Sequence, residues 1–104
     1  MADRRPRRRR REDLPVEVVE LRSAIVRRIQ EVQDVMFGKA GAPEMARSIG
    51  VPYRTYLHWI EGIGVVSAHA ILQVMVRHGV ASRWLHHGEG PMFEPQVRLR
   101  GRAG

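Results

Sequence analysis

Glycines divide this sequence into short apolar segments, and their positions constrain the fold more than any other feature. Gly38, Gly50, Gly62 and Gly79 each follow a stretch in which apolar residues recur at three- and four-residue steps. That recurrence is typical of one face of an α-helix, whereas a half-buried strand needs apolar and polar residues in alternation. Because no alternating stretch occurs, the sequence predicts an all-α domain of five helices.

The first segment is the longest. Asp13 is a candidate cap, and Pro15 is compatible with the first turn of a helix that would end near Gly38. An apolar stripe is expected to face the core, and it comprises Val18, Leu21, Ile25, Ile29, Val32 and Met36. Three further valines lie off this stripe, namely Val19, Val26 and Val35. The helix therefore carries more apolar surface than one neighbour would cover.

The fourth and fifth helices are expected after a connector, "GIGVV". Ser67 is suited to cap "AHAILQVMVRH", which Gly79 would terminate. The side chains expected to face inward from it are Ile71, Leu72, Met75 and Val76. The short fifth helix, "ASRWLHH", would be capped by Ser82 or by the turn before it and closed by "GEGP".

Charge is concentrated at the two ends of the chain. Residues 1–13, the arginine arm, hold seven arginines and three acidic residues, whereas residues 95–104 hold three arginines and no acidic residue. Residues 14–94 hold eight basic and eight acidic side chains and are neutral. We expect the arm to be disordered, because its like charges repel and no apolar residue anchors it. Attraction to polyanions is thus expected mainly from the tails, and the central domain would recognise its target by geometry.

These observations predict three regions and exclude several classes of protein. The regions are an arm at 1–13, a domain at 14–92 and a short basic tail at 93–104. Disulfides and cysteine-based zinc sites are excluded because there is no cysteine. The five histidines lack metal-ligand spacing and no catalytic set is present, so we expect no metal, no cofactor and no enzyme activity. Short apolar runs and the lack of an export signal indicate a soluble cytoplasmic, nucleoid-associated protein without a membrane segment.

Residues 45–62, "MARSIGVPYRTYLHWIEG", are expected to form two helices joined by a tight turn. Two helices that cross closely need a small residue where they meet, and Ala46 is the candidate. Four residues later, Gly50 stands where the chain must leave the first helix with a positive φ, which glycine adopts without strain. Val51 would then fill the turn as an apolar plug. The first of these helices has Pro43 in its first turn.

Helical periodicity separates two faces on the second of these helices, which begins near Pro52. Tyr56 and Trp59 are expected to pack with Met45 and Ile49 and onto the fourth helix. The opposite face carries Tyr53, Arg54, Leu57, His58 and Glu61. Hydrogen-bond donors near the N-terminal tip of an outward-facing helix are what reading the major groove of DNA requires.

This pattern resembles the lambda-repressor-like helix-turn-helix regulators, in particular the phage CI-type and XRE-type domains. The resemblance rests on "MARSIGVPYRTYLHWIEG", on Ser67 at the start of the next helix and on "HGVASRWLHHGEGP" near the end. In that family a small residue, a glycine, an apolar turn residue and a tryptophan recur at these offsets. The similar region covers residues 22–92. It implies a sequence-specific double-stranded DNA-binding transcriptional regulator, Cro-like or repressor-like, of phage or bacterial type.

The resemblance also implies that residues 52–61 are the recognition helix in the major groove. Base contacts are then expected from Tyr53, Arg54, Leu57 and His58. Contacts with the DNA backbone are expected from Arg47, Thr55 and the arm residues Arg4, Arg5, Arg7, Arg8, Arg9, Arg10 and Arg11.

Two features depart from the family pattern. Many relatives begin the helix before the recognition helix with a glutamine that contacts the DNA backbone, and this chain has Ala42 there. The first helix is also about two turns longer than the family needs. Because relatives bind as dimers, we expect a homodimer, with Val16, Val18 and Val19 on the extension as candidate contacts.

Two other classes of function stay open. A protein-interaction module, such as an antitoxin or an adaptor, would use the same fold to hold a protein partner on the first helix. A non-specific nucleic-acid binder would depend on the basic tails, and its target would include RNA because arginine-rich segments fold on RNA.

Overall fold

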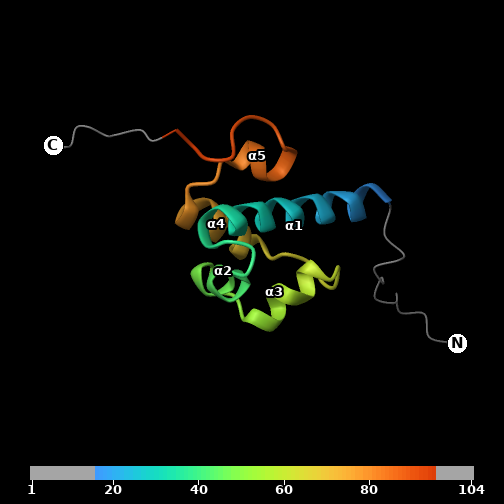
Figure 1. Cartoon of the computed structure of the whole chain (residues 1–104). Helices are drawn as coiled ribbons and strands as arrows, with labels where there is room; N and C mark the ends of the chain where they lie inside the picture. Colours follow the sequence, from blue (N-terminus) through green and yellow to red (C-terminus); the bar gives the residue numbers. More distant parts are fainter. Residues whose placement is uncertain (1–15, 96–104) are drawn as a thin grey trace, which may run out of the picture.

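The computed structural model describes residues 16–95, and it contains five α-helices (Figure 1). Their bounds are α1 Val16–Phe37, α2 Ala42–Ser48, α3 Tyr53–Ile60, α4 Ala68–His78 and α5 Ser82–His87. Within residues 16–95 the only β pairing is one isolated antiparallel bridge between Val80 and Phe93. The expectation of an all-α domain with five helices is therefore confirmed. Asp13, Pro15 and the arginine arm lie outside the described residues.

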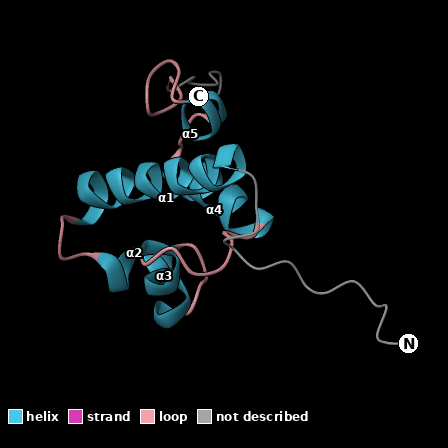
Figure 2. Cartoon of the chain, turned by 90° about the vertical axis from the view of Figure 1, so that its right-hand side faces the viewer, coloured by secondary structure: helices cyan, strands magenta, loops and turns pink. Residues whose placement is uncertain are grey.

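The five helices form layers around α1. Viewed from the side, α5 lies above α1, α4 runs beside it, and α2 and α3 lie below (Figure 2). The core is built from buried side chains of every helix and of the α4–α5 turn, and these are Ile29, Val32, Met45, Ala46, Ile49, Tyr56, Trp59, Ala70, Val74, Val80 and Leu85. No helix among residues 16–95 is long and apolar enough to cross a membrane.

Helix α1 departs from the sequence expectation over its N-terminal half. Ile29 and Val32 are buried as predicted, but Val18, Leu21 and Met36 on the same stripe are exposed, Leu21 by 56%. For Val18 and Leu21 the reason is length, because α1 extends past α5 and its first turns have no helix packed on that side (Figure 1), whereas Met36 lies in the last turn of α1. Val26, which lies off the predicted stripe, packs against the core instead.

Helix α4 begins and ends as predicted but presents a different face to the core. The Ser67 side chain accepts a hydrogen bond from the Ala70 backbone N–H at 3.1 Å, and Gly79 ends the helix in the left-handed conformation with φ of 67°. The residues buried from α4 are Ala70 and Val74, while Ile71 and Met75 are half-buried.

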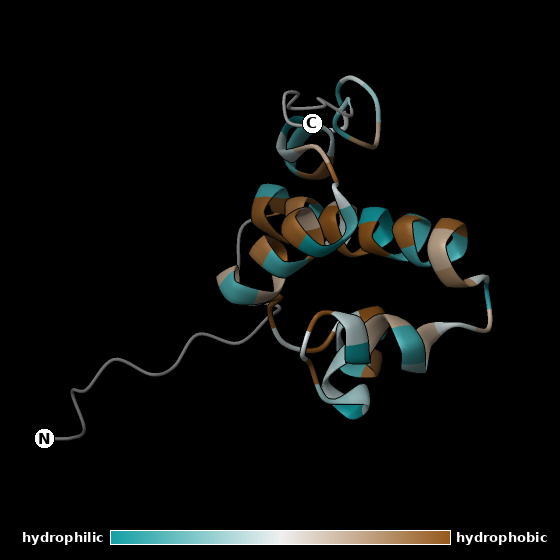
Figure 3. Ribbon diagram, turned by 90° about the vertical axis from the view of Figure 1, so that its left-hand side faces the viewer, coloured by the Kyte–Doolittle hydropathy of each residue, from teal (hydrophilic) through white to brown (hydrophobic). Residues whose placement is uncertain are grey.

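The prediction that Leu72 and Val76 face inward is wrong, because they are 52% and 73% exposed. The apolar residues of α4 form one wide arc opposite His69, Gln73 and Arg77, so periodicity could not indicate which part of that arc meets the core. Figure 3 shows hydrophobic colour on several sides of the helical layer formed by α1 and α4.

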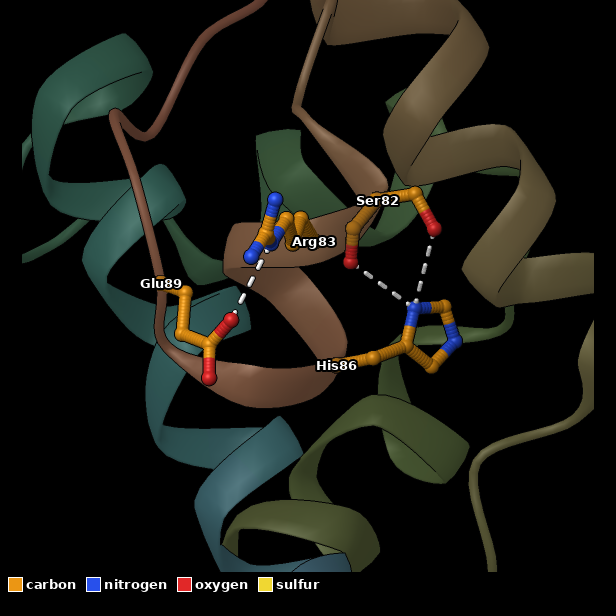
Figure 4. A network of polar contacts seen from close by, with 4 residues as sticks. All are labelled: Ser82, Arg83, His86 and Glu89. Carbon is orange, nitrogen blue, oxygen red and sulfur yellow. Dashed lines mark hydrogen bonds and ion pairs between the residues drawn. The ribbon is translucent and has the colours of Figure 1, made fainter.

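Helix α5 is stabilised by polar contacts near its two ends and by a hydrogen bond from α1. Its N-cap is Ala81 rather than Ser82, and the Ser82 side chain and carbonyl oxygen both contact His86 Nδ1 instead (Figure 4). Arg83 pairs with Glu89 at 3.0 Å on the surface (Figure 4). From α1, Arg28 donates a hydrogen bond to the Leu85 carbonyl oxygen at 3.0 Å, which ties α5 to the first helix.

His78 joins three helices at the C-terminal end of α4. Its Nε2 lies 2.8 Å from Ser48 Oγ of α2, and its ring meets Phe37 of α1 edge-on at 5.7 Å between centroids. Burial, with a smaller contribution from the neighbouring Arg77 charge, lowers the pKa of His78. The neutral imidazole is thus favoured, and it serves as a packed hydrogen-bonding group in the domain.

Candidate nucleic-acid interface

The turn between α2 and α3 has the conformation that the sequence predicts. Gly50 has φ of 72°, and its N–H donates to the Arg47 carbonyl oxygen at 3.2 Å. One residue later, the Val51 N–H donates to the Ala46 carbonyl oxygen at 2.9 Å. These two bonds form a Schellman motif, which satisfies the last carbonyl groups of α2 and turns the chain sharply. Pro52, with φ of −59° and ψ of 142°, then leads into α3.

Gly50→Ala is expected to lower the free energy of unfolding by about 1 kcal/mol, because a residue with a Cβ atom is strained at positive φ. No atom lies within 4 Å of the position a Cβ would take there, so the effect comes from the backbone alone. Urea denaturation of the two proteins measures it. Gly50→Asn is the matched control, because asparagine tolerates this conformation better, and an asparagine variant no more stable than the alanine variant would contradict this explanation.

Close packing fixes α3 against α2. Ala46 is buried where the two helices meet, as predicted, and Tyr56 and Trp59 bury the inner face of α3. The two aromatic rings contact each other edge-on, with centroids 6.2 Å apart. Because Ala46 has only a methyl group, the backbone of α2 can approach that inner face closely.

A buried hydrogen-bond network fixes α3 against α1. The Tyr56 hydroxyl donates to Gln33 Oε1 at 2.8 Å, and Gln33 Nε2 donates to the carbonyl oxygens of Gly38 and Lys39 at 3.2 and 3.0 Å. Burial, aided by the negative charge of Asp34, raises the pKa of Tyr56, so its hydroxyl remains a donor. The network joins the recognition-helix candidate to the α1–α2 loop, and it sets the direction in which the outer face of α3 points.

The outer face of α3 is open to solvent. Arg54, His58 and Glu61 are exposed, and Tyr53 is 47% exposed. Thr55 and Leu57 are half-buried on either side of this face. Because residues 54, 58 and 61 recur at four- and three-residue steps, they form a single stripe along the helix. The predicted outward orientation is therefore confirmed for Tyr53, Arg54, His58 and Glu61 and is partial for Leu57.

A shallow depression lies between α2 and α3 beside this stripe. It is lined by Pro43, Ala46, Arg47, Val51 and Tyr53. Arg47 and Tyr53 are both exposed, so one small hollow is lined by a residue with a guanidinium and a residue with a phenol group. The combination offers hydrogen-bond donors with an apolar floor, which is suited to a phosphate and its adjoining sugar.

The other predicted site residues lie away from this face of α3 or outside the described residues. Val16 and Val18 are exposed on the first turns of α1. Val19 is half-buried and lines a small cavity with Val26 and Trp59, so it faces the protein's own α3–α4 connector. The seven arm arginines lie outside the described residues.

Gln33 is the residue behind the candidate interface that sequence reasoning did not single out, and its role is to hold α3 through buried hydrogen bonds. It lies one position after the predicted core residue Val32 on a helix rich in polar residues, and nothing in its spacing distinguishes it from Gln30. Its role is visible only when the Tyr56 hydroxyl is placed opposite it.

No protein-family model, curated protein or solved structure matches this chain. Among residues 16–95, no group of three or more histidine, cysteine, aspartate or glutamate side chains is arranged to hold a metal ion.

Proposed function

We propose that this chain is a sequence-specific double-stranded DNA-binding regulator, and that α3 is its recognition helix. We infer with this that the five helices adopt a lambda-repressor-like helix-turn-helix arrangement. The observation that supports the proposal is the solvent-exposed stripe of Arg54, His58 and Glu61 on a short helix that the core holds rigidly. A rigid helix with an uncovered polar face is the element that enters a major groove.

Arg54 would read a base in this proposal. It lies in the first turn of α3, where side chains reach the groove floor, and no other described residue pairs with it. A guanidinium donates two parallel hydrogen bonds to the O6 and N7 atoms of guanine, which is the commonest specific contact in the major groove. His58, one turn further along, would donate to a guanine or to a phosphate, and Leu57 would contact a thymine methyl group.

The α2–α3 depression would hold the DNA backbone. Arg47 and Tyr53 in its lining provide the donors that fix a helix in register on the phosphates, and Thr55 would add a hydroxyl on the opposite side of α3. We therefore assign Tyr53 to a contact with the DNA backbone or with a thymine methyl group. It does not lie at the centre of the base-reading stripe. The described domain is electrically neutral, so its affinity would depend on these few contacts and on the arginine arm.

Selection of bound sequences from a random pool of DNA duplexes tests the proposal. The full chain is incubated with the pool at two salt concentrations, and the bound duplexes are sequenced after several rounds. We expect an enriched motif with at least one guanine whose enrichment is lost when Arg54→Ala replaces the natural chain. Uniform retention of the pool, with no enriched motif at either salt concentration, would reject sequence-specific reading.

Removal of residues 1–13 is expected to weaken binding to every duplex and to flatten the dependence of affinity on salt. The arm holds seven arginines, and each phosphate neutralised contributes about 0.9 to the slope of log K against log salt concentration. Titrations of selected and scrambled duplexes at several salt concentrations measure both effects. Loss of the preference for the selected duplex, with the domain still folded, would show that the arm reads the sequence.

A further inference from the structure

A small cavity lies between α1 and the connector that joins α3 to α4. Its volume is about 40 Å³, and its lining includes Val19, Arg22, Ser23, Val26, Trp59 and Gly64. The connector passes below α1 (Figure 1), and the Arg22 guanidinium holds it there by donating to the Gly64 carbonyl oxygen at 2.6 Å. Because one water molecule needs about 10–15 Å³ of such space, the cavity accommodates about three waters or one ligand of about four heavy atoms.

Trp59 lies at the closed end of the cavity and has an indole N–H without an acceptor. Only 6% of this residue is exposed, and among residues 16–95 no atom accepts a hydrogen bond from its Nε1. A buried donor without an acceptor destabilises the folded state, so native structures rarely contain one that neither water nor a ligand satisfies. An indole nitrogen can only donate, so the occupant of the cavity must present an acceptor.

Two further donors line the same cavity. Ser23 is exposed and therefore lies at the mouth, and its hydroxyl makes no hydrogen bond to any residue between 16 and 95. Arg22 is half-buried and uses one guanidinium nitrogen on Gly64, which leaves donors on its other two nitrogens. The lining residues include no aspartate or glutamate to balance this charge. The polar part of the cavity therefore attracts an anion.

The apolar part of the lining selects among anions. The side chains of Val19 and Val26 and the ring of Trp59 provide apolar walls beside the donors. A phosphate or sulfate presents oxygen atoms in every direction, so the oxygens that face the valines would lose water without gaining a hydrogen bond. A short carboxylate has two acceptor oxygens at one end and an alkyl group at the other, so it matches both parts of the lining.

We propose that this cavity binds a small aliphatic monocarboxylate of the size of acetate. Its oxygens accept hydrogen bonds from the Trp59 indole N–H and the Arg22 guanidinium, and its methyl group packs on the two valines. Trp59 belongs to α3 and Arg22 to α1, so the ligand joins these helices at a place separate from the bond between Gln33 and Tyr56. The inference stands independently of DNA binding, because none of these residues is on the outer face of α3.

Nuclear magnetic resonance of the isotope-labelled full chain tests the proposal. The sequence holds two tryptophans, and Trp84→Phe removes one of the two indole signals and so identifies the signal of Trp59. Sodium acetate is added at neutral pH, and sodium chloride keeps the ionic strength constant. We expect a saturable shift of the Trp59 indole proton with a dissociation constant in the millimolar range, because so small a ligand makes few contacts. Trp84 does not line the cavity, so its signal in the natural chain is the internal control.

Arg22→Gln is expected to raise the dissociation constant for acetate at least about tenfold, because a charged hydrogen bond is lost. Arg27→Gln is the matched control, since it removes the same charge from an exposed position of α1 outside the cavity, and it should change the constant less than about twofold. Ser23→Ala, at an exposed position, should raise the constant about threefold. It tests the site without disturbing the hydrogen bond that holds the connector. Acetamide, which is neutral and has nearly the same shape, should bind at least about tenfold more weakly than acetate.

A Trp59 indole signal that shows no saturable shift at acetate concentrations well above the millimolar range overturns the proposal, because the cavity would then hold water alone. A dissociation constant that neither Arg22→Gln nor Ser23→Ala changes overturns it too, since acetate would then bind elsewhere. Sodium phosphate that shifts the Trp59 signal at the same concentrations as acetate would overturn the choice of a carboxylate.

Discussion

Arg54→Ala is expected to weaken binding to the selected duplex by about 1–3 kcal/mol, which is roughly 5- to 150-fold in the dissociation constant. In the proposed contact, the loss would correspond to two hydrogen bonds between a guanidinium and one guanine. Arg54 is exposed on the outer face of α3, so its truncation leaves the core untouched. Affinities for the selected duplex and for a scrambled duplex of the same length, measured at one salt concentration, provide the comparison.

Arg77→Ala is the matched control for this substitution. Arg77 is exposed near the end of α4, so its loss removes one positive charge without removing a donor from α3. Because phosphate attraction depends on charge and base reading depends on position, only the Arg54 variant should lose its preference for the selected sequence. Equal losses on the selected and scrambled duplexes would assign Arg54 to the DNA backbone and remove the main support for base reading by α3.

Gln33→Leu is expected to lower the free energy of unfolding by about 2–3 kcal/mol, although leucine has a similar volume. The substitution leaves the Tyr56 hydroxyl buried without an acceptor and takes away the donor that satisfies the Gly38 and Lys39 carbonyl oxygens. Urea denaturation followed by circular dichroism measures the change. Gln30→Leu, on the same helix and half-buried, is the control and is expected to change stability by less than about 1 kcal/mol.

Addition of Tyr56→Phe to the Gln33→Leu variant should restore part of that stability. The double variant has neither the buried hydroxyl nor its acceptor, so the penalty of an unsatisfied polar group disappears. A double-mutant cycle on Gln33 and Tyr56 then gives the coupling energy between the two side chains. A coupling energy near zero would show that the hydrogen bond at 2.8 Å does not stabilise the placement of α3.

The boundaries of the helices were predictable because backbone chemistry is local. Gly38, Gly50 and Gly79 have positive φ, and Ser67 caps α4 as the sequence indicated. Each of these residues acts through its own conformation or through hydrogen bonds within a few positions, so no knowledge of tertiary contacts is needed. The same argument explains why the turn between α2 and α3 was anticipated in detail.

The facing directions of the two most apolar helices were predicted less well. Leu21 on α1 and both Leu72 and Val76 on α4 were expected inside and are exposed. Periodicity locates an apolar stripe, but it cannot tell how far along a helix the neighbouring elements extend. It also cannot indicate which part of a wide apolar arc meets the core.

The candidate interface also has one part that the sequence determined and one part that only the tertiary structure decided. The sequence by itself determined which residues occupy the outer face of α3, because Tyr56 and Trp59 on one side leave Arg54 and His58 on the other at 3.6 residues per turn. Only the tertiary structure decided how rigidly and in which direction that face is presented. Its orientation depends on the buried hydrogen bond between Tyr56 and Gln33, which lie 23 residues apart, and the depression beside it exists only because α2 and α3 pack together. Contacts between residues so distant in the chain arise only when the helices pack, and no local pattern in the sequence encodes them.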